Sequence, residues 1–449
     1  MRHSFRLGLL AAVGTSVLGL GGFSVFAGGA IATSGASAAA LPAAAPFAIP
    51  VGRIAGSSPP TTAQCEATQG IPCYSPQQLR TAYDMAPLYS AGDNGQGETI
   101  VLVDAYGSPT IQSDLASFDS GFGLPAAPSF KIIQPAGKVT GSNSDWALET
   151  SLDVEMSHAM APDANILLVE TPTNETIGTA GFPQIVKAEE YVIKHHLGDV
   201  ISQSFGAAEE TFPSASSIMG LRGAYTLADK DNVTVLASAG DAGVSSPSNV
   251  ANTTYFTKRV VNWPASDPLV TAVGGTQLHL NAAGDRTKPD NVWNDTAALG
   301  EPAAGSGGVS SVFSRPSYQS SVSSIVGSAR GIPDVALSAA VVGAAIIYDG
   351  GWQLVGGTSE ASPLFAGIVA IADQVAGHDL GPLNPALYGL GSGAAGLPDI
   401  TNGDNTVTVP TSGGGEVTVT GYTAVTGYDL ASGLGTVDGA KLVAELTGS

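Results

Sequence analysis

The sequence predicts an α/β fold in which a twisted parallel sheet is covered by helices on both faces. From Tyr74 onward, short β-rich apolar runs alternate with segments of helical periodicity, a pattern typical of parallel strands joined by helices. The chain has 449 residues, of which 43% are hydrophobic and only 12% charged. It is therefore long and apolar enough for one large α/β domain or two ordinary ones, with a sizeable core.

Six apolar runs are the predicted strands, and they cover residues 99–107, 165–171, 199–206, 233–241, 269–275 and 344–350. The predicted helices between them are Asp145–Met160, Pro183–His196 and Ser217–Lys230. Sites in such sheets collect at the carboxyl ends of the strands, which here means the loops that carry Gly107, Gly206 and Gly243.

The last part of the chain has a different composition. From about Leu383 it is rich in Gly and Asp and has little helical periodicity. We expect loops there, organised by an ion or by the core.

The first 38 residues are typical of an export signal. An apolar, Gly-rich run at Leu7–Ala32 follows three basic residues, Arg2, His3 and Arg6, and small-residue cleavage sites occur at Ala27 or Ala38. A retained membrane anchor is the alternative, but the glycines make this run a poor spanning helix, and no second apolar stretch is long enough. We therefore expect a secreted protein with no membrane contact after signal removal.

Residues 39–73 are predicted to be a linker or short pro-segment, and residues 74–449 the main domain. The stretch up to about Thr62 is rich in Ala, Pro and Ser. Cys65 and Cys73, the only cysteines, are predicted to form one local disulfide in an exported chain. Two thiols without nearby histidines are too few ligands for zinc.

The charge balance excludes nucleic acid as a partner. There are 38 Asp and Glu against 17 Lys and Arg, for a net charge of -21, and no basic stripe is present. Such a balance suggests a working pH at which many carboxylates are protonated. Solubility outside the cell explains it equally well, and composition does not separate the two.

The predicted helix 145–160 places two carboxylates on the face that should be buried. Glu149 and Asp153 are four residues apart and lie within an apolar stripe that includes Trp146 and Met156. The opposite face, with Glu155 and His158, is expected to be solvated. Buried carboxylates are paired, protonated or functional. Because basic residues are few, we favour a general acid/base pair that shares a proton.

The stretch "VGGTSEASPLFAGIVA", Val355 to Ala370, places Ser359 where a strand turns into an apolar helix. Taken alone, this serine is a helix cap or a nucleophile. A nucleophile needs a base, a group that orients the base, and a donor for the oxyanion. Glu360 and Ser362 are interpreted as ordinary helix-start residues.

Several motifs together resemble one peptidase family. The Glu-x-x-x-Asp helix, "SAGDAG" after a strand and "GGTSEASP" at a helix start resemble the sedolisins, as do "VDAYG", "SQSFGAAEE", "GIPDVALSA" and "GYDLASGLGT". Sedolisins are serine-carboxyl peptidases with a subtilisin-like, three-layer fold. The resemblance runs from about Tyr74 to the C-terminus, with the motifs in family order.

The resemblance implies a role for each candidate residue. Ser359 matches the nucleophile, Glu149 the general base, Asp153 the group that orients the base, and Asp241 the oxyanion residue. The Ser359 N–H is a plausible second oxyanion donor. An aspartic acid donates only when protonated, and a Glu base with an ordinary pKa of about 4.3 still works in acid. Both points imply activity at acidic pH.

Two alternatives remain open. A neutral subtilisin places a histidine, usually followed by Gly, at a helix start, and none of the six histidines here fits that pattern. Asp104 lies at the strand end where a subtilisin has its triad aspartate; we interpret it as a support for the other carboxylates or, preferably, a turn cap. Asp334 is interpreted as structural. The second alternative is an inactive secreted binding protein with the same fold.

The resemblance also implies one structural calcium ion. In "LPDITNGDN" and "AVTGYDLASGLG", the matching ligands are two carboxylates and three backbone carbonyls: Asp399, Asp429, Ile400, Val425 and Gly427. Calcium prefers six to eight oxygen ligands of these kinds. Without the resemblance, ordinary Gly/Asp turns would be the better interpretation.

Many sedolisins carry a long folded pro-domain, whereas only about Ala39 to Tyr74 separates the expected signal from the core here. Control of activity is therefore open, and ionisation of Asp241 at neutral pH is one hypothesis for latency. We expect a secreted, monomeric, acid-active serine-carboxyl endopeptidase that acts on proteins or peptides.

Overall fold

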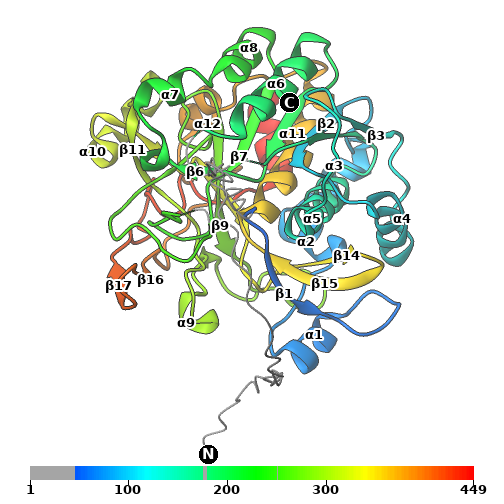
Figure 1. Cartoon of the computed structure of the whole chain (residues 1–449). Coiled ribbons are helices and arrows are strands. Elements are labelled where there is room, and N and C mark those ends of the chain that lie inside the picture. The colour runs from blue at the N-terminus through cyan, green and yellow to red at the C-terminus, as the bar shows by residue number, and fades with distance from the viewer. Residues whose placement is uncertain (1–45, 175–178, 250) are drawn as a thin grey trace, which may run out of the picture. The chain divides into compact units, whose positions relative to one another are not determined.

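A sheet of eight strands forms the centre of the fold (Figure 1). The computed structural model describes residues 46–174, 179–249 and 251–449, so the expected export signal lies outside the described residues. The strand order is β10-β9-β7-β5-β2-β4-β3, and β13 pairs with β9 in parallel. The parallel strands are β2 (Thr99–Ala105), β3 (Phe130–Ile133), β4 (Asn165–Thr171), β5 (Val200–Gln203), β7 (Thr234–Ser238), β9 (Thr271–Gln277) and β13 (Val335–Ser338). The predicted α/β fold with a parallel sheet is thus confirmed.

Each face of the sheet has its own core. Successive strand residues point to opposite faces, so Ile100 and Leu102 of β2 join one cluster while Val101 and Val103 join the other. The helices on the first face are α4 (Ile111–Phe122), α5 (Ser144–Met160), α11 (Thr358–Ala376) and α13 (Gly439–Thr447). Those on the second are α6 (Phe182–Lys194) and α8 (Gly223–Asp231). The three layers are therefore helix, sheet and helix.

Helices α5 and α11 pack directly against each other on the first face. A β-carbon at Gly367 of α11 would lie 2.6 Å from the Met160 β-carbon, so this close approach requires glycine. Every residue of α5 from Trp146 to Met160 is buried. The predicted solvated face is therefore wrong, because α4 and β14 (Ala344–Tyr348) cover the side of α5 that α11 leaves free.

The polar residues expected on that face have buried partners instead. Glu155 Oε2 accepts a hydrogen bond of 2.7 Å from the Ile347 amide. His158 Nε2 lies 2.8 Å from the Pro125 carbonyl oxygen. Hydrogen bonding to the main chain explains how these side chains are tolerated in the interior.

The predicted elements outside the sheet need three corrections. The run 344–350 does form β14, but it pairs with β15 (Gly351–Gly356) in a separate antiparallel sheet. The helix expected over Ser217–Lys230 is split into α7 (Ala215–Met219) and α8. The region after Leu383 contains two helices as well as loops: α12 (Asn384–Leu390) and α13, with the hairpin β16 (Val407–Pro410) and β17 (Glu416–Val419).

The remaining elements are short. They are α2 (Pro76–Ala82), α3 (Ala86–Ala91), β6 (Ala207–Ala208), β8 (Asn262–Trp263), β10 (Asn291–Val292), α9 (Thr296–Leu299), β11 (Gly308–Ser314), α10 (Ser323–Val326) and β12 (Ala329–Ile332). Among the described residues no helix has the length and apolar character needed to span a bilayer.

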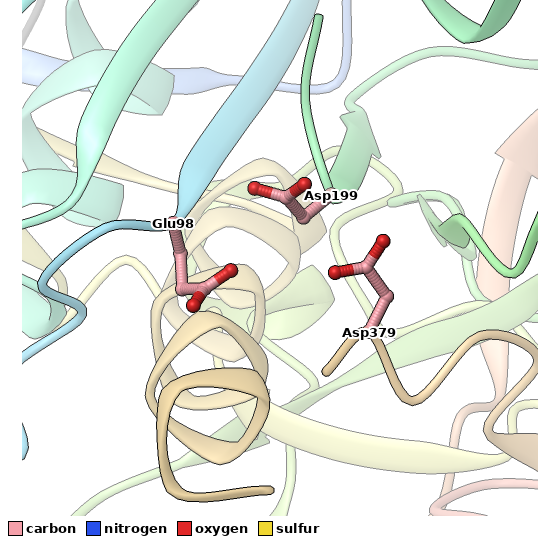
Figure 2. A group of neighbouring side chains, drawn as sticks. All are labelled: Glu98, Asp199 and Asp379. Carbon is pink, nitrogen blue, oxygen red and sulfur yellow. The ribbon is translucent and has the colours of Figure 1, made fainter. Parts of the chain in front are cut away.

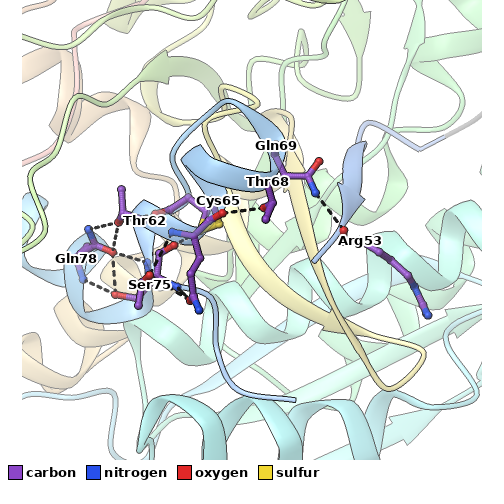
Figure 3. The surroundings of a disulfide bond; sticks show 10 residues. Arg53, Thr62, Cys65, Thr68, Gln69, Ser75 and Gln78 are labelled. Carbon is purple, nitrogen blue, oxygen red and sulfur yellow. Dashed lines mark hydrogen bonds between the residues drawn. A yellow bond between two sulfur atoms is a disulfide. The ribbon is translucent and has the colours of Figure 1, made fainter. Parts of the chain in front are cut away.

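The segment predicted as a linker contains a strand and a helix. Strand β1 (Ile49–Arg53) pairs antiparallel with β15, as Figure 1 shows in blue and yellow, and α1 (Thr62–Gln69) follows. Cys65 and Cys73 form the predicted disulfide (Figure 3). Gln69 Nε2 donates to the Arg53 carbonyl oxygen at 3.1 Å, which ties α1 to the end of β1. The predicted boundaries between signal, linker and main domain, after residues 38 and 73, remain predictions.

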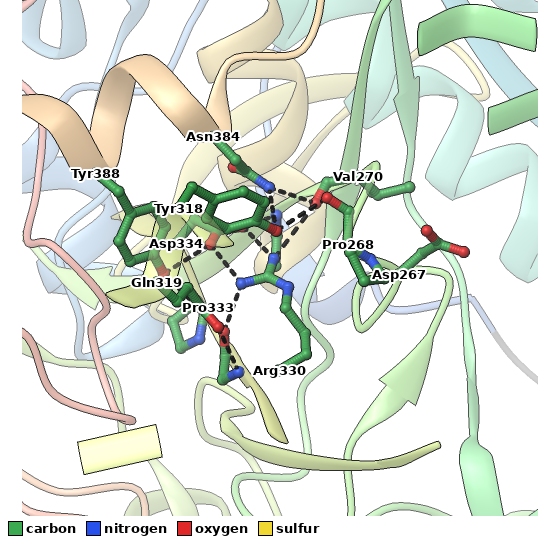
Figure 4. A network of polar contacts seen from close by, with 12 residues as sticks. Asp267, Pro268, Val270, Tyr318, Gln319, Arg330, Pro333, Asp334, Asn384 and Tyr388 are labelled. Atoms are coloured by element: carbon green, nitrogen blue, oxygen red, sulfur yellow. Dashed lines mark hydrogen bonds and ion pairs between the residues drawn. The ribbon is translucent and has the colours of Figure 1, made fainter. Parts of the chain in front are cut away.

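A buried ion pair fixes the entry to β13 (Figure 4). The Arg330 guanidinium donates to both carboxylate oxygens of Asp334, and both side chains are fully buried. Asp334 also accepts from the Tyr388 hydroxyl at 2.9 Å and from the Ala272 amide, at the start of β9, at 2.8 Å. Its interpretation as structural agrees with this network.

Arg330→Met tests the importance of this ion pair. The substitution leaves the Asp334 charge buried without its cation, and we expect a loss of about 3–5 kcal/mol in the free energy of unfolding, measured by denaturant titration. Lys194→Met is the control, because it breaks the exposed pair with Glu190 and should cost about 1 kcal/mol or less. Equal losses in the two variants would contradict the structural role.

Candidate active site

Ser359 lies in the first turn of α11, directly after a tight connection from β15. That connection is one residue, Gly357, with φ 120°, a conformation that side chains rarely adopt. A β-carbon at Gly357 would lie 2.3 Å from the Phe47 carbonyl oxygen and 2.5 Å from Asp241 Oδ2. Only glycine fits here, and its turn brings Ser359 beside two segments that are distant in the sequence.

The Ser359 side chain is buried, and its hydroxyl is available to react. It is 0% exposed, and its Oγ has no hydrogen-bond partner among the described residues. The Ser359 amide likewise donates to no group in the described part of the chain. It belongs to the first turn of a 19-residue helix, where the helix dipole favours negative charge.

Glu149 faces both Ser359 and the N-terminal segment. Its Oε2 accepts a hydrogen bond of 2.8 Å from the Ala48 amide. Its Oε1 is buried and has no hydrogen bond of ordinary geometry within the described residues. The Ser359 hydroxyl is nevertheless close enough to lower the pKa of Glu149. The carboxyl therefore lies between the hydroxyl and an amide.

Asp153 and Asp104 continue this arrangement behind Glu149. Asp153, one helical turn further along α5, accepts a hydrogen bond of 2.7 Å from the Ser204 hydroxyl. Asp104, near the end of β2, lies close enough to Asp153 and the Thr150 hydroxyl to change its pKa, although neither of its buried oxygens has a hydrogen bond of ordinary geometry among the described residues. Asp104 thus lies beside the carboxyls of α5 and accepts from no turn amide among the described residues, so the preferred interpretation as a turn cap is wrong. We call Glu149, Asp153 and Asp104 the carboxyl row.

Burial favours protons shared within the carboxyl row up to unusually high pH. Burial is the main cause that raises the pKa of Glu149 and Asp153 well above their ordinary values, and the neighbouring Asp104 raises both further. Burial also raises the pKa of Asp104 to about 7. No ion pair among the described residues supplies a cation to the row. The three acids therefore titrate together.

Asp241 is arranged to donate a hydrogen bond from one oxygen. Its Oδ1 accepts from the amide and the hydroxyl of Thr358, at 2.8 and 2.7 Å, while its buried Oδ2 has no partner among the described residues. Burial raises the pKa of Asp241 to about 7. Below that pH the free Oδ2 is the natural place for the proton, next to the Ser359 turn.

A cleft opens beside Asp241. Its walls include Gly206 from the loop after β5, together with Asn262, Tyr255 and Glu301. Phe47 from the N-terminal segment also lines it. The cleft lies at the carboxyl ends of the strands, where the sequence placed the site.

Two residues near Ser359 differ from their prediction as ordinary helix-start residues. Glu360 is fully buried, and burial raises its pKa to about 8. The buried Ser362 hydroxyl lies 2.8 Å from the hydroxyl of Ser202. Both belong to the packing between α11 and its neighbours, which a sequence pattern of apolar residues does not reveal.

The predicted calcium ligands lie around one loop. Asp399 Oδ2 accepts a hydrogen bond of 2.8 Å from the Gly427 amide, and Asp429 Oδ2 accepts one of 3.0 Å from the Val425 amide. Among the described residues, no hydrogen bond ends on the carbonyl oxygens of Ile400, Val425 or Gly427. The two carboxylates and three free carbonyls therefore fit the oxygen chemistry of calcium.

A second group of acids lies at the other end of the parallel strands from Ser359 (Figure 2). Glu98, Asp199 and Asp379 have carboxylate oxygens within 4.8 Å of one another. Glu98 and Asp199 directly precede β2 and β5, so they lie at the amino ends of the strands, away from Ser359. Burial and the neighbouring Asp199 raise the pKa of Glu98 to about 7. Burial also raises the pKa of Asp199.

The sequence missed the partners that complete the site. Ser204 lies in "SQSFGAAEE" and Thr358 in "GGTSEASP", but a hydroxyl group alone does not indicate which carboxylate it binds. The contacts of Phe47 and Ala48 came from a segment expected to be a linker. Their signal was weak: the segment "FAIPVGR", Phe47–Arg53, contains alternating apolar residues within an Ala- and Pro-rich region.

The comparisons with known proteins agree with one another. A model described as the subtilase family matches residues 134–385, more than half of the chain. Kumamolisin of Bacillus sp. (strain MN-32) is 33% identical over 382 residues, covering 83% of this chain and 63% of that protein. Sedolisin of Pseudomonas sp. (strain 101) is 30% identical over 384 residues, covering 83% of this chain and 61% of that protein.

A solved structure of Pseudomonas sedolisin, described as a serine-carboxyl proteinase complexed with two molecules of pseudo-iodotyrostatin, has a TM-score of 0.70 and 28% identity. The match covers 84% of this chain and 99% of that one. The chain spans less than two thirds of the length of both curated relatives.

Glu360→Gln tests whether buried acids are held protonated. A carboxyl whose pKa is raised in the folded state stabilises the fold below its unfolded pKa of about 4, and this is lost as the pH rises through the folded value. For Glu360 that value is about 8. We expect melting temperatures similar to wild type at pH 4 and higher than wild type at pH 8.

The exposed Glu416 provides the control. Glu416→Gln should follow the wild-type dependence of melting temperature on pH. The interpretation is contradicted if Glu360→Gln and Glu416→Gln change with pH in the same way.

Proposed function

The chain belongs to the subtilase family, and from this premise we propose that it is an acid-active serine-carboxyl endopeptidase of the sedolisin type. Its substrates would be proteins or peptides. The observation that carries the proposal is the position of Ser359 beside the buried Glu149 carboxyl, with the unpaired Asp241 Oδ2 next to the same turn. No histidine is needed in this arrangement.

In the proposed reaction the carboxyl row carries one negative charge, placed on Glu149, and Ser359 Oγ attacks the carbonyl carbon of the scissile bond while this carboxylate takes the hydroxyl proton. Glu149 then returns this proton to the leaving amine, and water hydrolyses the acyl-enzyme in the same manner. Asp153, held by Ser204, orients Glu149, and Asp104 lets the row carry a single negative charge.

The oxyanion would be held by the Asp241 carboxylic acid and the Ser359 amide. This role needs a protonated Asp241, so activity should fall as the pH rises through about 7. Latency at neutral pH would follow from the same ionisation. Full peptidase activity at pH 7 in the purified chain would contradict this part of the proposal.

We further propose one structural calcium ion, held by the carboxylates of Asp399 and Asp429 and the carbonyls of Ile400, Val425 and Gly427. The hydrogen bonds from the amides of Val425 and Gly427 to the carboxylates of Asp429 and Asp399, which bring both acids to one loop, support the site. When bound, the ion would cross-link the two C-terminal loops and take no part in the reaction. Secretion and a monomeric state are proposed with the function; the bilayer-length run Leu7–Ala32 lies outside the described residues.

Hydrolysis of a denatured protein between about pH 2.5 and 7 tests the proposed function. We expect wild type to be active in acid, and Ser359→Ala and Glu149→Gln to lose activity. Asp241→Ala should lose about 100- to 1000-fold in kcat. An Asn side chain donates at any pH, so Asp241→Asn should keep part of the activity and extend it above pH 7.

Two outcomes would overturn the mechanism. If Ser359→Ala hydrolyses the substrate as fast as wild type, the chain is not a serine peptidase. If Asp241→Asn and wild type lose activity over the same neutral pH range, ionisation of Asp241 does not set the alkaline limit.

A chelator tests the calcium proposal separately. We expect EDTA to lower the melting temperature of wild type, because loops held by the ion lose their cross-link. Asp399→Asn should already melt lower and respond little to EDTA. Asp404→Asn, a neighbouring aspartate whose Oδ1 only accepts from the Thr406 amide, should respond as wild type does. An unchanged wild-type melting temperature in EDTA would contradict the site.

A further inference from the structure

The amino ends of two parallel strands and the end of α11 bring three acids together. Glu98 and Asp199 directly precede the neighbouring strands β2 and β5, in which Ile100 is opposite Val200. Asp379 follows the end of α11, and Figure 2 shows its carboxyl beside those of the other two acids. One carboxylate oxygen from each of the three lies within 4.8 Å of the others. The fold therefore concentrates negative charge at this point.

A fourth acid, Asp373 in the last turn of α11, is buried beside this group. Its Oδ1 accepts a hydrogen bond of 2.8 Å from the amide of Leu380, the residue after Asp379. The Asp373 side chain is 0% exposed, and its buried Oδ2 has no hydrogen-bond partner among the described residues. Burial first, and then the charges of all three acids of the group, raise the pKa of Asp373 to about 8. The Asp373 carboxyl therefore faces the three acids with one oxygen free.

We call Glu98, Asp199, Asp373 and Asp379 the acidic cluster, and no basic side chain balances it. None of the ion pairs among the described residues includes a member of the cluster. The Thr99 amide donates to Asp199 Oδ2 at 2.7 Å, but an amide carries no net charge. Ionised carboxylates this close repel one another. At neutral pH, protons or a cation must therefore offset the charge.

The geometry of the acidic cluster fits a calcium ion. Calcium binds oxygen at about 2.3–2.6 Å, so two ligands on opposite sides of one ion are about 5 Å apart. The oxygens of the three half-buried acids lie within that span. The free Oδ2 of Asp373 would be a fourth ligand, and water reaches the half-buried acids and can supply the rest. Calcium tolerates such a mixed and irregular shell, whereas magnesium needs a nearly ideal octahedron.

We propose that the acidic cluster is a second site for a hard divalent cation, with calcium the best fit. The ion would connect the C-terminal end of α11 to the starts of β2 and β5. It would therefore stabilise the end of α11 that is farthest from Ser359. The site shares no residue with the calcium site proposed at Asp399 and Asp429, and it does not depend on the proposed peptidase function.

The exposure of the acidic cluster sets the affinity that we expect. Because three of its acids are half-buried, water competes with the protein for the ion. We expect a Kd of about 0.1–1 mM, the range of calcium sites in extracellular modules. Such a site is filled when calcium is added and is lost on dialysis. EDTA therefore reports on the site at Asp399, whereas added calcium reports on the acidic cluster.

The test uses the dialysed full chain with Asp399→Asn, which removes the first site, at about pH 7.5, where ordinary carboxyl groups are ionised. Titration calorimetry with calcium chloride should give one bound ion. Calcium chloride should also raise the melting temperature more than sodium chloride of equal ionic strength, which only screens the net charge of -21. Adding Asp373→Asn or Asp379→Asn should weaken calcium binding by about 10-fold or more and abolish the extra rise. The matched variant Asp145→Asn removes an exposed acid and should leave both readouts unchanged.

Two results would overturn the second cation site. The inference fails if the Asp399→Asn chain binds no calcium up to about 10 mM. It also fails if the added Asp379→Asn leaves calcium binding as tight as the added Asp145→Asn does. Asp379 is half-buried, so this comparison decides the question even if the buried Asp373→Asn does not fold. Because the binding test needs no catalytic residue, a failed peptidase assay would contradict the proposed function alone.

Discussion

The burial of carboxylic acids where α5 meets α11 is the constraint on which the rest of the structure depends. Helix α5 is enclosed by α11, the sheet, α4 and β14, so no water reaches Glu149 or Asp153. A carboxylate in such a place costs free energy unless it is paired or protonated. The described ion pairs provide no cation for the carboxyl row. Sharing protons, so that the row carries a single negative charge, is then the way to avoid the cost of burying three carboxylates. A protein built in this way is suited to acid, and the low number of basic residues in the chain fits the same condition.

Strand β15 links this constraint to the N-terminal segment. One end of β15 leads through Gly357 into the helix that carries Ser359, and its edge pairs with β1. The same strand therefore positions the nucleophile and the chain segment opposite it. Because Gly357 leaves no room for a side chain between Phe47 and Asp241, the acid that would donate to an oxyanion and the Phe47 carbonyl oxygen meet at one point.

Much of this arrangement could be predicted from local patterns, and the rest depends on contacts distant in sequence. Alternating strand and helix signals predicted the parallel sheet, and two carboxylates on an apolar helical face indicated the site. The solvated face of α5 could not be judged from its own sequence, because burial of Glu155 is decided by the amide of Ile347 in another element. Asp104 looked like a turn residue, since only the sheet places the end of β2 beside α5. Likewise, the alternating apolar residues of Phe47–Arg53 gave only a weak signal, because the position of Phe47 depends on the register between β1 and β15.

An infrared titration of the carboxyl C=O band tests the central claim most directly. The account predicts that protonated carboxyl groups persist in the folded wild-type protein at pH 6, and that part of this signal disappears when Asp153 is replaced by Asn. Exposed Asp and Glu ionise near pH 4, so they do not contribute at that pH. Complete ionisation of all carboxyl groups by pH 5 in the folded protein would contradict the account.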